Sequence, residues 1–369
     1  LREAEDIARE QAAADPENTL ARRDLAASLA NVALVLNKMD DWTGAVASYR
    51  ESLGNLRALA VKDPGNASWR RDIAETLRKM GDAQRSQFDV DGALASYREA
   101  LEINRALAAA DPDSSARKAD LEAMLREIGT TLNRKGDQAG ALQNFREALV
   151  LTREISSKDP DNLPRRQDVW KCLTIIASIL TAQGDHEAAF ATIREEVDAA
   201  RATSAKAPHD SRWRRDVATS LVQFGQALVQ NNDHKSALDA YHEAIAILRE
   251  LSKDKADQSD MRFDLAMALM NLGDLLTADK NLDGADDSYL EALAIEHEIT
   301  VKVPKEAEWR YALAATLLKL AAIGDNPVAH LREALTVAKE LQQKDQLPQP
   351  GLVGQIEQLL AAFTPKPAQ

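Results

Sequence analysis

One segment of this chain has the residue types and spacing of a calcium-binding loop. The sequence DKNLDGADDSYLE begins at Asp279 and has carboxylate or amide residues at its first, third and fifth positions and a glycine at its sixth. The twelfth position should be a glutamate that binds the ion through both oxygens, but it is Leu290, and Glu291 comes one residue late. We therefore interpret the segment as part of a repeated helical unit and not as a metal site.

Three histidine–glutamate pairs begin like the helix of a zinc protease. They start at His186, His242 and His297, but none has a second histidine four residues on. Cys172 is the single cysteine, which excludes an internal disulfide, and we expect a buried, inert thiol. No glycine-rich phosphate loop, nucleophile elbow or pair of nearby cysteines occurs. The sequence therefore predicts no catalytic residue, no metal and no cofactor, and so no enzyme activity.

The chain is organised by an internal repeat of 48 residues. The acidic residue of an RRD motif recurs at Asp24, Asp72, Asp120, Asp168, Asp216 and Asp264. Five residues later a leucine recurs at Leu29, Leu77, Leu125, Leu173, Leu221, Leu269 and Leu317. A period of this length indicates that one supersecondary unit is stacked on copies of itself.

Two charged motifs, RRD and YRE, occur in most repeats. A feature present in nearly every unit is better explained as scaffold than as a binding site. We expect the YRE charges to form a solvated face or pairs between repeats, at Arg50–Glu51, Arg98–Glu99 and Arg146–Glu147.

Each repeat predicts two helices. A proline corner stops the preceding helix, because the residue before a proline is pushed out of the α region. The first helix then begins at an N-cap column formed by Asn18, Asn66, Ser114, Asn162 and Asp210. The second helix begins at another, formed by Asp41, Asp89, Asp137, Asp185, Asp233 and Asn281. In the shortened seventh repeat, we expect Asn326 as the cap and Pro327 as the first helical residue.

The helix pair resembles the tetratricopeptide repeat. A glycine column comprises Gly81, Gly129, Gly225 and Gly273, and alanine, an aromatic residue and alanine follow at +12, +16 and +19. The leucine column stands where that family usually has tryptophan, and 48 residues replace about 34, which lengthens both helices. The resemblance covers essentially the whole chain and implies an all-α, right-handed α-solenoid of antiparallel helix pairs.

We expect four parts along the chain. Residues 1–14 form the second helix of a truncated repeat, 15–302 six repeats, 303–345 a shortened seventh repeat, and 346–369 a capping helix and tail. Because the chain opens inside a repeat without an initiator methionine, we expect a fragment of a longer protein. Ile7 and Ala8 would then face a missing helix, so the open N-terminal edge could support self-association.

Composition narrows the class of partner. The chain of 369 residues has a formal net charge of −13, which argues against a nucleic-acid groove. No apolar run approaches the roughly 20 residues that a helix needs to cross a bilayer, so we expect no membrane span. One cysteine fits a reducing compartment, and we expect a cytoplasmic protein.

The resemblance implies that the first helices line a concave groove, at positions −6, −3, +1 and +4 from the glycine column. In repeat two these positions hold Glu75, Arg78, Asp82 and Arg85. In repeats four to six they are mainly short, neutral hydrogen-bonding residues, which suit the backbone of an extended peptide. With neighbouring amides and an outlying tryptophan, the predicted binding residues are Trp170, Lys171, Thr174, Ser178, Thr181, Thr219, Gln223, Gln226, Gln230 and Asn271.

For three apolar residues near this groove, two interpretations remain open. Met267 and Met270 could supply adaptable contacts to a partner or be ordinary packing. Trp170 replaces an alanine found in most repeats, so it could anchor a partner or fill a local gap.

We expect a non-catalytic interaction or scaffold module that binds an extended peptide or a partner protein in its groove. The alternative is a regulatory sensor arm of a multidomain enzyme whose catalytic domain lies upstream of residue 1. The long repeats resemble arrays attached to effector domains in bacterial multidomain proteins.

Overall fold

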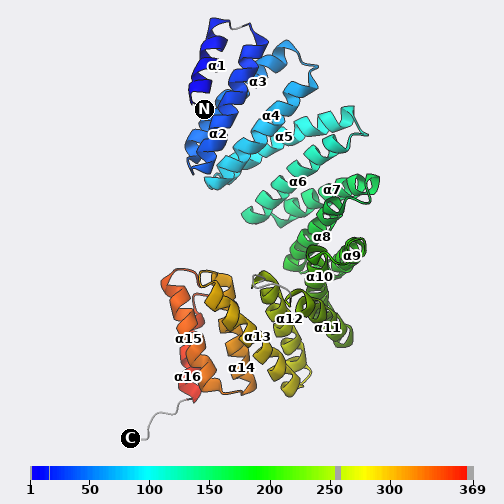
Figure 1. The fold of residues 1–369 in the computed structure, drawn as a ribbon, viewed down its shortest axis with the longest axis vertical. Helices are drawn as coiled ribbons and strands as arrows, with labels where there is room; N and C mark the ends of the chain where they lie inside the picture. The colour runs from blue at the N-terminus through cyan, green and yellow to red at the C-terminus, as the bar shows by residue number, and fades with distance from the viewer. Residues whose placement is uncertain (1, 16, 254–258, 364–369) are drawn as a thin grey trace. The chain divides into compact units, whose positions relative to one another are not determined.

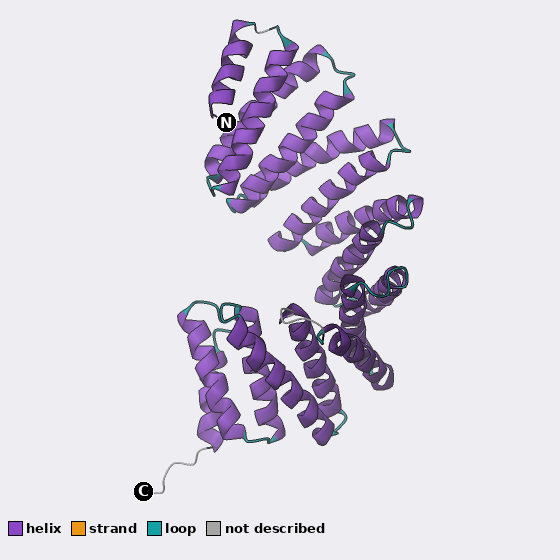
Figure 2. Ribbon diagram, in the orientation of Figure 1, coloured by secondary structure: helices purple, strands orange, loops and turns teal. Residues whose placement is uncertain are grey.

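The computed structural model describes residues 2–15, 17–253 and 259–363. Across these residues the regular structure is entirely helical, and no strand occurs in this described part (Figure 2). The prediction of an all-α fold is therefore confirmed.

The chain divides into two compact units at Gly184 (Figure 1). Unit 1 holds α1 (Arg2–Ala14), α2 (Thr19–Lys38), α3 (Trp42–Lys62), α4 (Ala67–Ser86), α5 (Val90–Ala110), α6 (Ser115–Lys135), α7 (Gln138–Lys158) and α8 (Leu163–Gln183). Unit 2 holds α9 (His186–Ser204), α10 (Ser211–Gln230), α11 (His234–Leu251), α12 (Ser259–Ala278), α13 (Leu282–Lys302), α14 (Ala307–Ile323), α15 (Pro327–Gln343) and α16 (Leu352–Phe363).

Within each unit the helices stack in chain order. From α1 to α8 in unit 1, and from α9 to α16 in unit 2, each helix packs against the next one along the chain. The even-numbered helices from α2 to α14 are the first helices of the repeats. Some neighbouring first helices also touch, namely α2 and α4 in unit 1, and α10 and α12, and α12 and α14, in unit 2. This nearest-neighbour packing is the arrangement of an α-solenoid.

Side-chain caps fix where the helices begin. Asn66 accepts hydrogen bonds from the backbone N–H groups of Ser68 and Trp69 at the start of α4, and Asp89 accepts one from Gly92 at the start of α5. The other residues of both predicted cap columns act in the same way. Asn326 does stand at the N-cap of α15, but its backbone is left-handed (φ 33°) and its side chain makes no capping bond.

The glycine column lets the two helices of a repeat approach closely. An added Cβ at Gly81 would lie 2.5 Å from a ring carbon of Tyr97, which is fully buried. The leucine column, represented by Leu77, lies in the same core and is at most 2% exposed in every repeat. Glycine therefore gives the Tyr97 ring its room in repeat two, whereas repeat one accommodates Ala33 in the same column beside Tyr49.

This contact predicts opposite outcomes for two helical glycine-to-alanine substitutions. Gly81→Ala should destabilise the protein by about 1–3 kcal/mol, because the new methyl group overlaps the Tyr97 ring. Gly54→Ala lies inside α3, where an added Cβ meets nothing within 4 Å, and should stabilise by about 0.5–1 kcal/mol. Urea unfolding followed by circular dichroism measures both. Equal stabilisation by the two changes would contradict the packing role of Gly81.

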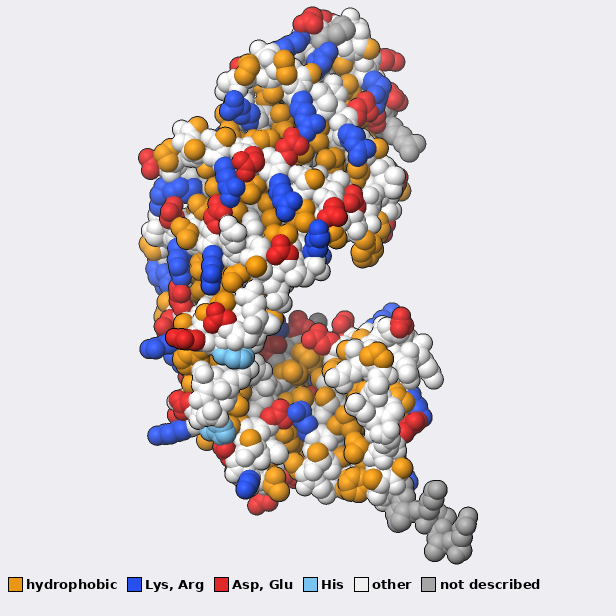
Figure 3. Space-filling model, turned by 180° about the vertical axis from the view of Figure 1, so that it is seen from behind, with side chains coloured by type: hydrophobic (Ala, Val, Ile, Leu, Met, Phe, Trp, Pro, Cys, Tyr) orange, Lys and Arg blue, Asp and Glu red, His pale blue; other side chains and the backbone are white. Residues whose placement is uncertain are grey.

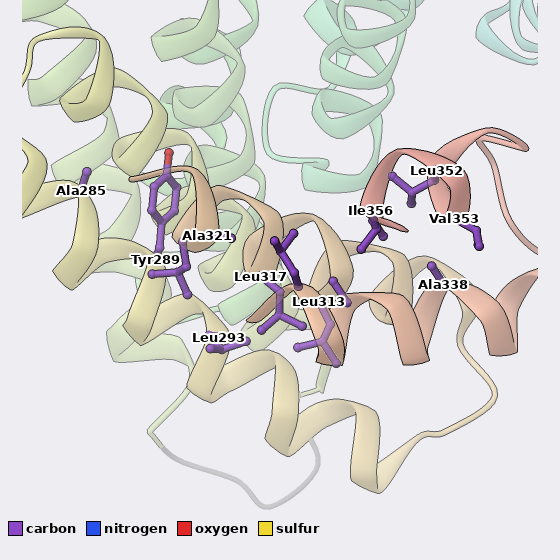
Figure 4. Close-up of a cluster of buried hydrophobic side chains, with 13 residues drawn as sticks. Ala285, Tyr289, Leu293, Leu313, Leu317, Ala321, Ala338, Leu352, Val353 and Ile356 are labelled. Atoms are coloured by element: carbon purple, nitrogen blue, oxygen red, sulfur yellow. The ribbon is translucent and has the colours of Figure 1, made fainter. Parts of the chain in front are cut away.

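The last helix covers the end of the stack in unit 2. Leu352, Val353 and Ile356 of α16 are buried in one cluster with Ala338 of α15 and Leu317 of α14 (Figure 4). In the segment 346–369, α16 spans Leu352–Phe363.

At the other end, α1 packs on α2. Ala8 is 5% exposed and lies in a cluster with Leu25 and Leu29, whereas Ile7 is half exposed. The expectation that Ala8 faces a missing preceding helix is therefore wrong, because its side chain is directed at the following repeat. Of the two residues only Ile7 is exposed at this edge.

One buried carboxylic acid in unit 2 is held in an apolar setting. Glu296 on α13 is fully buried, and its Oε1 accepts a hydrogen bond from Thr316 Oγ1 on α14 (3.1 Å). Its Oε2 is buried without a hydrogen-bond partner. Burial raises the pKa of Glu296 to about 8, so the neutral acid is favoured at pH 7.

This pKa makes stability depend on pH. Unfolded Glu296 would titrate near its ordinary value of 4.5, so between about pH 4.5 and 8 the folded state binds more protons. Each pH unit in that window should lower the free energy of unfolding by up to about 1.4 kcal/mol. Glu296→Gln should remove this loss, measured by urea unfolding from pH 5 to 9. Glu298→Gln, at an exposed position on α13, is the control, and an unchanged loss in Glu296→Gln would contradict the assignment.

No helix in the described part of the chain is long and apolar enough to cross a bilayer.

Candidate binding faces

The predicted binding residues fall in both units, and the two groups are described separately. In unit 1, α8 carries Trp170, Lys171, Thr174, Ser178 and Thr181. Lys171, Ser178 and Thr181 are exposed, and Trp170 and Thr174 are half-buried. The hydroxyls of Thr174 and Thr181 donate to backbone carbonyls one turn earlier in α8, at 3.0 and 2.9 Å. These hydroxyls therefore retain acceptor capacity but not a free donor.

In unit 2 the predicted residues lie on α10 and α12. Gln226 Nε2 donates to Asn271 Oδ1 at 2.9 Å, which joins the two first helices through their side chains. Asn271 Nδ2 is used by the backbone of its own helix, and Thr219 likewise donates to α10 carbonyls. Gln223 and Gln230 make no side-chain hydrogen bond with any described residue, so both amides remain available.

The methionines of α12 differ in their environment. Met270 is 7% exposed and belongs to the core, so its role is ordinary packing. Met267 is half-exposed and lies one turn before Asn271, whose amide donates to its carbonyl. Of Met267 and Met270, Met267 is the one that offers apolar surface beside the polar residues.

The second helices carry an ion-pair ladder. Within each unit, an arginine near the end of one second helix pairs with the YRE glutamate of the next, in Arg9–Glu51, Arg57–Glu99, Arg105–Glu147, Arg201–Glu243 and Arg249–Glu291. The glutamates of the predicted YRE motifs thus form pairs between repeats, as expected. Each partner is about half exposed, so each pair contributes little, typically up to about 1 kcal/mol.

A charged network in repeat two was not among the predicted binding residues. Arg78 makes two hydrogen bonds with Glu75 (2.7 and 2.9 Å) and one with Asp82 (3.0 Å). Arg85 continues the network to Glu127 on α6 (2.5 Å). In the sequence, the sign of this network is that the groove positions of repeat two alternate between negative and positive residues three or four positions apart. On the face of unit 1 seen in Figure 3, Lys and Arg side chains stand beside Asp and Glu side chains.

A tyrosine anchors this network. Tyr97 OH donates to Asp82 Oδ1 at 2.7 Å, and Tyr289 OH makes the same bond to Asp274 in repeat six. Burial raises the pKa of Asp82, an effect that the Tyr97 hydrogen bond and Arg78 oppose. The ring of the aromatic column thus also orients a carboxylate on the first-helix face.

Removing that hydroxyl should have a measurable cost. Tyr97→Phe should destabilise the protein by about 1–2 kcal/mol, because half-buried Asp82 loses a hydrogen bond. Tyr49→Phe is the matched control, since Tyr49 fills the same column but its hydroxyl bonds to no described residue, and its effect should stay within about 0.5 kcal/mol. Thermal unfolding compares the two. An equal effect of both changes would mean that the Asp82 bond contributes nothing.

A cleft opens beside the network, between α4 and α6. Its volume is about 440 Å³, and it is lined by Arg71, Asp72, Ala74, Glu75, Arg78, Asn104, Asp120, Ala123 and Met124. We call this the α4–α6 cleft. Ala123 leaves its mouth open, whereas Met267 occupies the same register position in unit 2.

The residues that resembled chemical sites have structural roles. The Asn281 side chain accepts a hydrogen bond from the Gly284 N–H and is the N-cap of α13. This role explains why the segment resembles a calcium-binding loop in sequence. His297 pairs with Glu333 (3.2 Å) on the second-helix surface. Cys172 is 1% exposed, and burial raises its pKa to about 11, so the thiol is protonated. No group of three or more metal-ligating side chains gathers among the described residues.

Comparison with known families decides the class of repeat. Residues 217–255 and 265–301 match the family model of the tetratricopeptide repeat. The family match covers these two segments of the chain. The two matches begin 48 residues apart, so they correspond to repeats five and six of the internal period. None of the curated proteins matches the chain.

Solved structures share the fold at low sequence identity. The apo form of the quorum sensor NprR from B. thuringiensis is 12% identical, with 92% of this chain and 88% of that chain covered and a TM-score of 0.50. A tetratricopeptide repeat protein from Parabacteroides merdae is 14% identical, with 91% and 97% covered and a TM-score of 0.49. BtubC from P. vanneervenii is 20% identical, with 69% and 91% covered and a TM-score of 0.49. The likeness to NprR concerns the fold alone.

Proposed function

We propose that this protein is a non-catalytic recognition module that holds an extended peptide or a partner protein on its first helices. The observation that carries the proposal is a contrast between two surfaces. The second helices repeat one ion pair, and the first helices present different side chains in each repeat.

The second-helix ladder satisfies its own charges. In Arg105–Glu147 and Arg249–Glu291, for example, a guanidinium and a carboxylate from neighbouring repeats lie 2.9 and 2.6 Å apart. A surface that repeats the same internally neutralised pair offers little to distinguish one partner from another. We therefore assign it to the scaffold.

The first helices keep polar groups available. Gln223 and Gln230 in unit 2 and Ser178 in unit 1 make no side-chain hydrogen bond with any described residue. Amide groups can both donate to and accept from a peptide backbone, whose donors and acceptors recur along an extended chain. Solenoid repeats typically use such faces for binding.

The partner class follows from charge and chemistry. A net charge of −13 disfavours nucleic acid, so we propose a peptide or protein partner. The sensor-arm alternative would use the same face and concerns residues upstream of this chain, so it stays a prediction. Self-association through the N-terminal edge also stays a prediction.

Peptide selection on the intact chain tests the proposal. Capped peptides selected from a random library should bind about tenfold or more weakly when two negative charges are added to a first-helix face. Gln226→Glu with Asn271→Glu tests unit 2, and Ser178→Glu with Thr181→Glu tests unit 1. Fluorescence anisotropy measures the dissociation constants.

The matched control adds the same charge to second helices. Ala246→Glu with Ala294→Glu changes exposed positions on α11 and α13, and affinity should stay within about twofold. Thermal unfolding confirms that each variant is folded. If the control weakens binding and both first-helix variants leave it unchanged, the first helices are not the binding face.

A further inference from the structure

One carboxylate of the repeating RRD motif lacks the partner that its register provides elsewhere. The second arginine of the motif pairs with the aspartate of the following repeat in Arg71–Asp120 and Arg215–Asp264. The same register would pair Arg23 with Asp72. Arg23 instead lies over the ring of Trp69, 5.4 Å from its centroid.

Asp72 is consequently left without an ion pair. Its carboxylate makes no hydrogen bond or ion pair with any described residue, although the side chain is half-buried and lines the α4–α6 cleft. Burial raises its pKa, and the charges of Arg23 and Arg71 oppose that shift without overcoming it. Both oxygens of the Asp72 carboxylate can therefore still accept hydrogen bonds in the lining of the cleft.

The floor of the cleft adds further acceptors. Asn104 on α5 is only 5% exposed, and its Nδ2 donates to the backbone oxygen of Asp120 (3.2 Å). The Asn104 amide oxygen accepts no hydrogen bond from any described residue. Asp120 Oδ2 is buried and also accepts none, although it forms ion pairs with Arg71 Nε at 3.3 Å and Arg117 Nη1 at 3.8 Å. Leaving the buried Asp120 Oδ2 without a hydrogen bond is unfavourable, and a donor in the cleft would relieve this.

The cleft is specific to this position in the array. The register equivalents of Asn104 are Leu56, Thr152, Ala200, Leu248 and Glu296, so only α5 has an amide at this position. Ala123 opens the wall that Met267 would narrow in unit 2. The volume of about 440 Å³ is ample for one long side chain.

We propose that the α4–α6 cleft binds a lysine or arginine side chain of the partner. Asp72, Asp120 and Asn104 supply acceptors, and ammonium and guanidinium groups carry only donors and a positive charge. The cleft's own cations are engaged, Arg78 by Glu75 and Asp82, and Arg71 by Asp120. Lys79 and Arg117 pair with Glu75 and Asp120 from outside the lining, so Asp72 is the lining carboxylate that has no ion pair with a described residue.

This inference rests on the proposed function, because it names the chemistry that one first-helix face recognises. It predicts that a basic residue is required only at the part of the partner that reaches unit 1. The ladder of the second helices plays no part in it.

A methyl signal in the cleft reports binding directly. Met124 is buried in the lining, and the chain has six methionines, so ¹³C-methyl methionine NMR on the intact chain resolves the site. The probe is a capped alanine pentapeptide with a central lysine, with arginine and norleucine versions in parallel. Lysine and arginine peptides should shift Met124 saturably, and norleucine should not. An equal response to norleucine would overturn the proposal.

Variants test the named residues. Asp72→Asn should weaken the lysine peptide about three- to tenfold, and Ala123→Met should abolish the shift by filling the cleft. Asp24→Asn, the exposed register equivalent in α2, should leave affinity unchanged. Raising salt should weaken binding in the native chain. Unchanged affinity in Asp72→Asn, with Ala123→Met folded by thermal unfolding and still binding, would overturn the proposal.

The two proposals can fail independently. If library peptides lose affinity on the first-helix variants but basic peptides never shift Met124, the recognition module stands and the basic-residue cleft does not. If basic peptides shift Met124 but library peptides are sensitive only to the second-helix control, the cleft stands and the general assignment does not.

Discussion

The structure depends on the close approach of the two helices within each repeat. Gly81 can lie against the Tyr97 ring only because it has no side chain, and the same pairing recurs in the glycine and aromatic columns. The contact fixes how each first helix is rotated about its axis, because the leucine column must then point into the core. The opposite columns are consequently presented away from the core in every repeat. Packing of these recurrent residues therefore decides which variable residues can meet a partner.

Recurrent and variable positions divide the charges into two classes. On the second helices, arginine and glutamate pair between repeats in the same register and neutralise each other. On the first helices, the pairing can differ at a single position. Arg23 stacks on Trp69, so it does not form the ion pair with Asp72 that the repeat register would give. Because a half-buried carboxylate without a partner is unfavourable, such exceptions mark places where a ligand can contribute. Binding sites in this array are best sought at positions where the ion pair that recurs in other repeats is missing.

The elements could be predicted from sequence because their signals are local. A cap such as Asn66 bonds to N–H groups two and three residues on, so its role is readable from spacing alone. The site was harder because its contacts join residues about 45 positions apart, as Gln226 and Asn271 do. The hydroxyls of Thr174 and Thr181 were counted as available, yet they bond their own helix. A cleft that depends on an alanine opposite an amide has no signature in one sequence.

The central claim is that scaffold and recognition occupy different helices of each repeat. A scan of single substitutions at every exposed position, scored by affinity for a selected peptide and separately by stability, measures this most directly. The account predicts that substitutions weakening affinity without lowering stability lie in the groove columns of the first helices. It also predicts that changes in the Arg–Glu ladder leave affinity unchanged. The account would be contradicted if the substitutions that weaken affinity lay in that ladder and substitutions on the first helices left affinity unchanged.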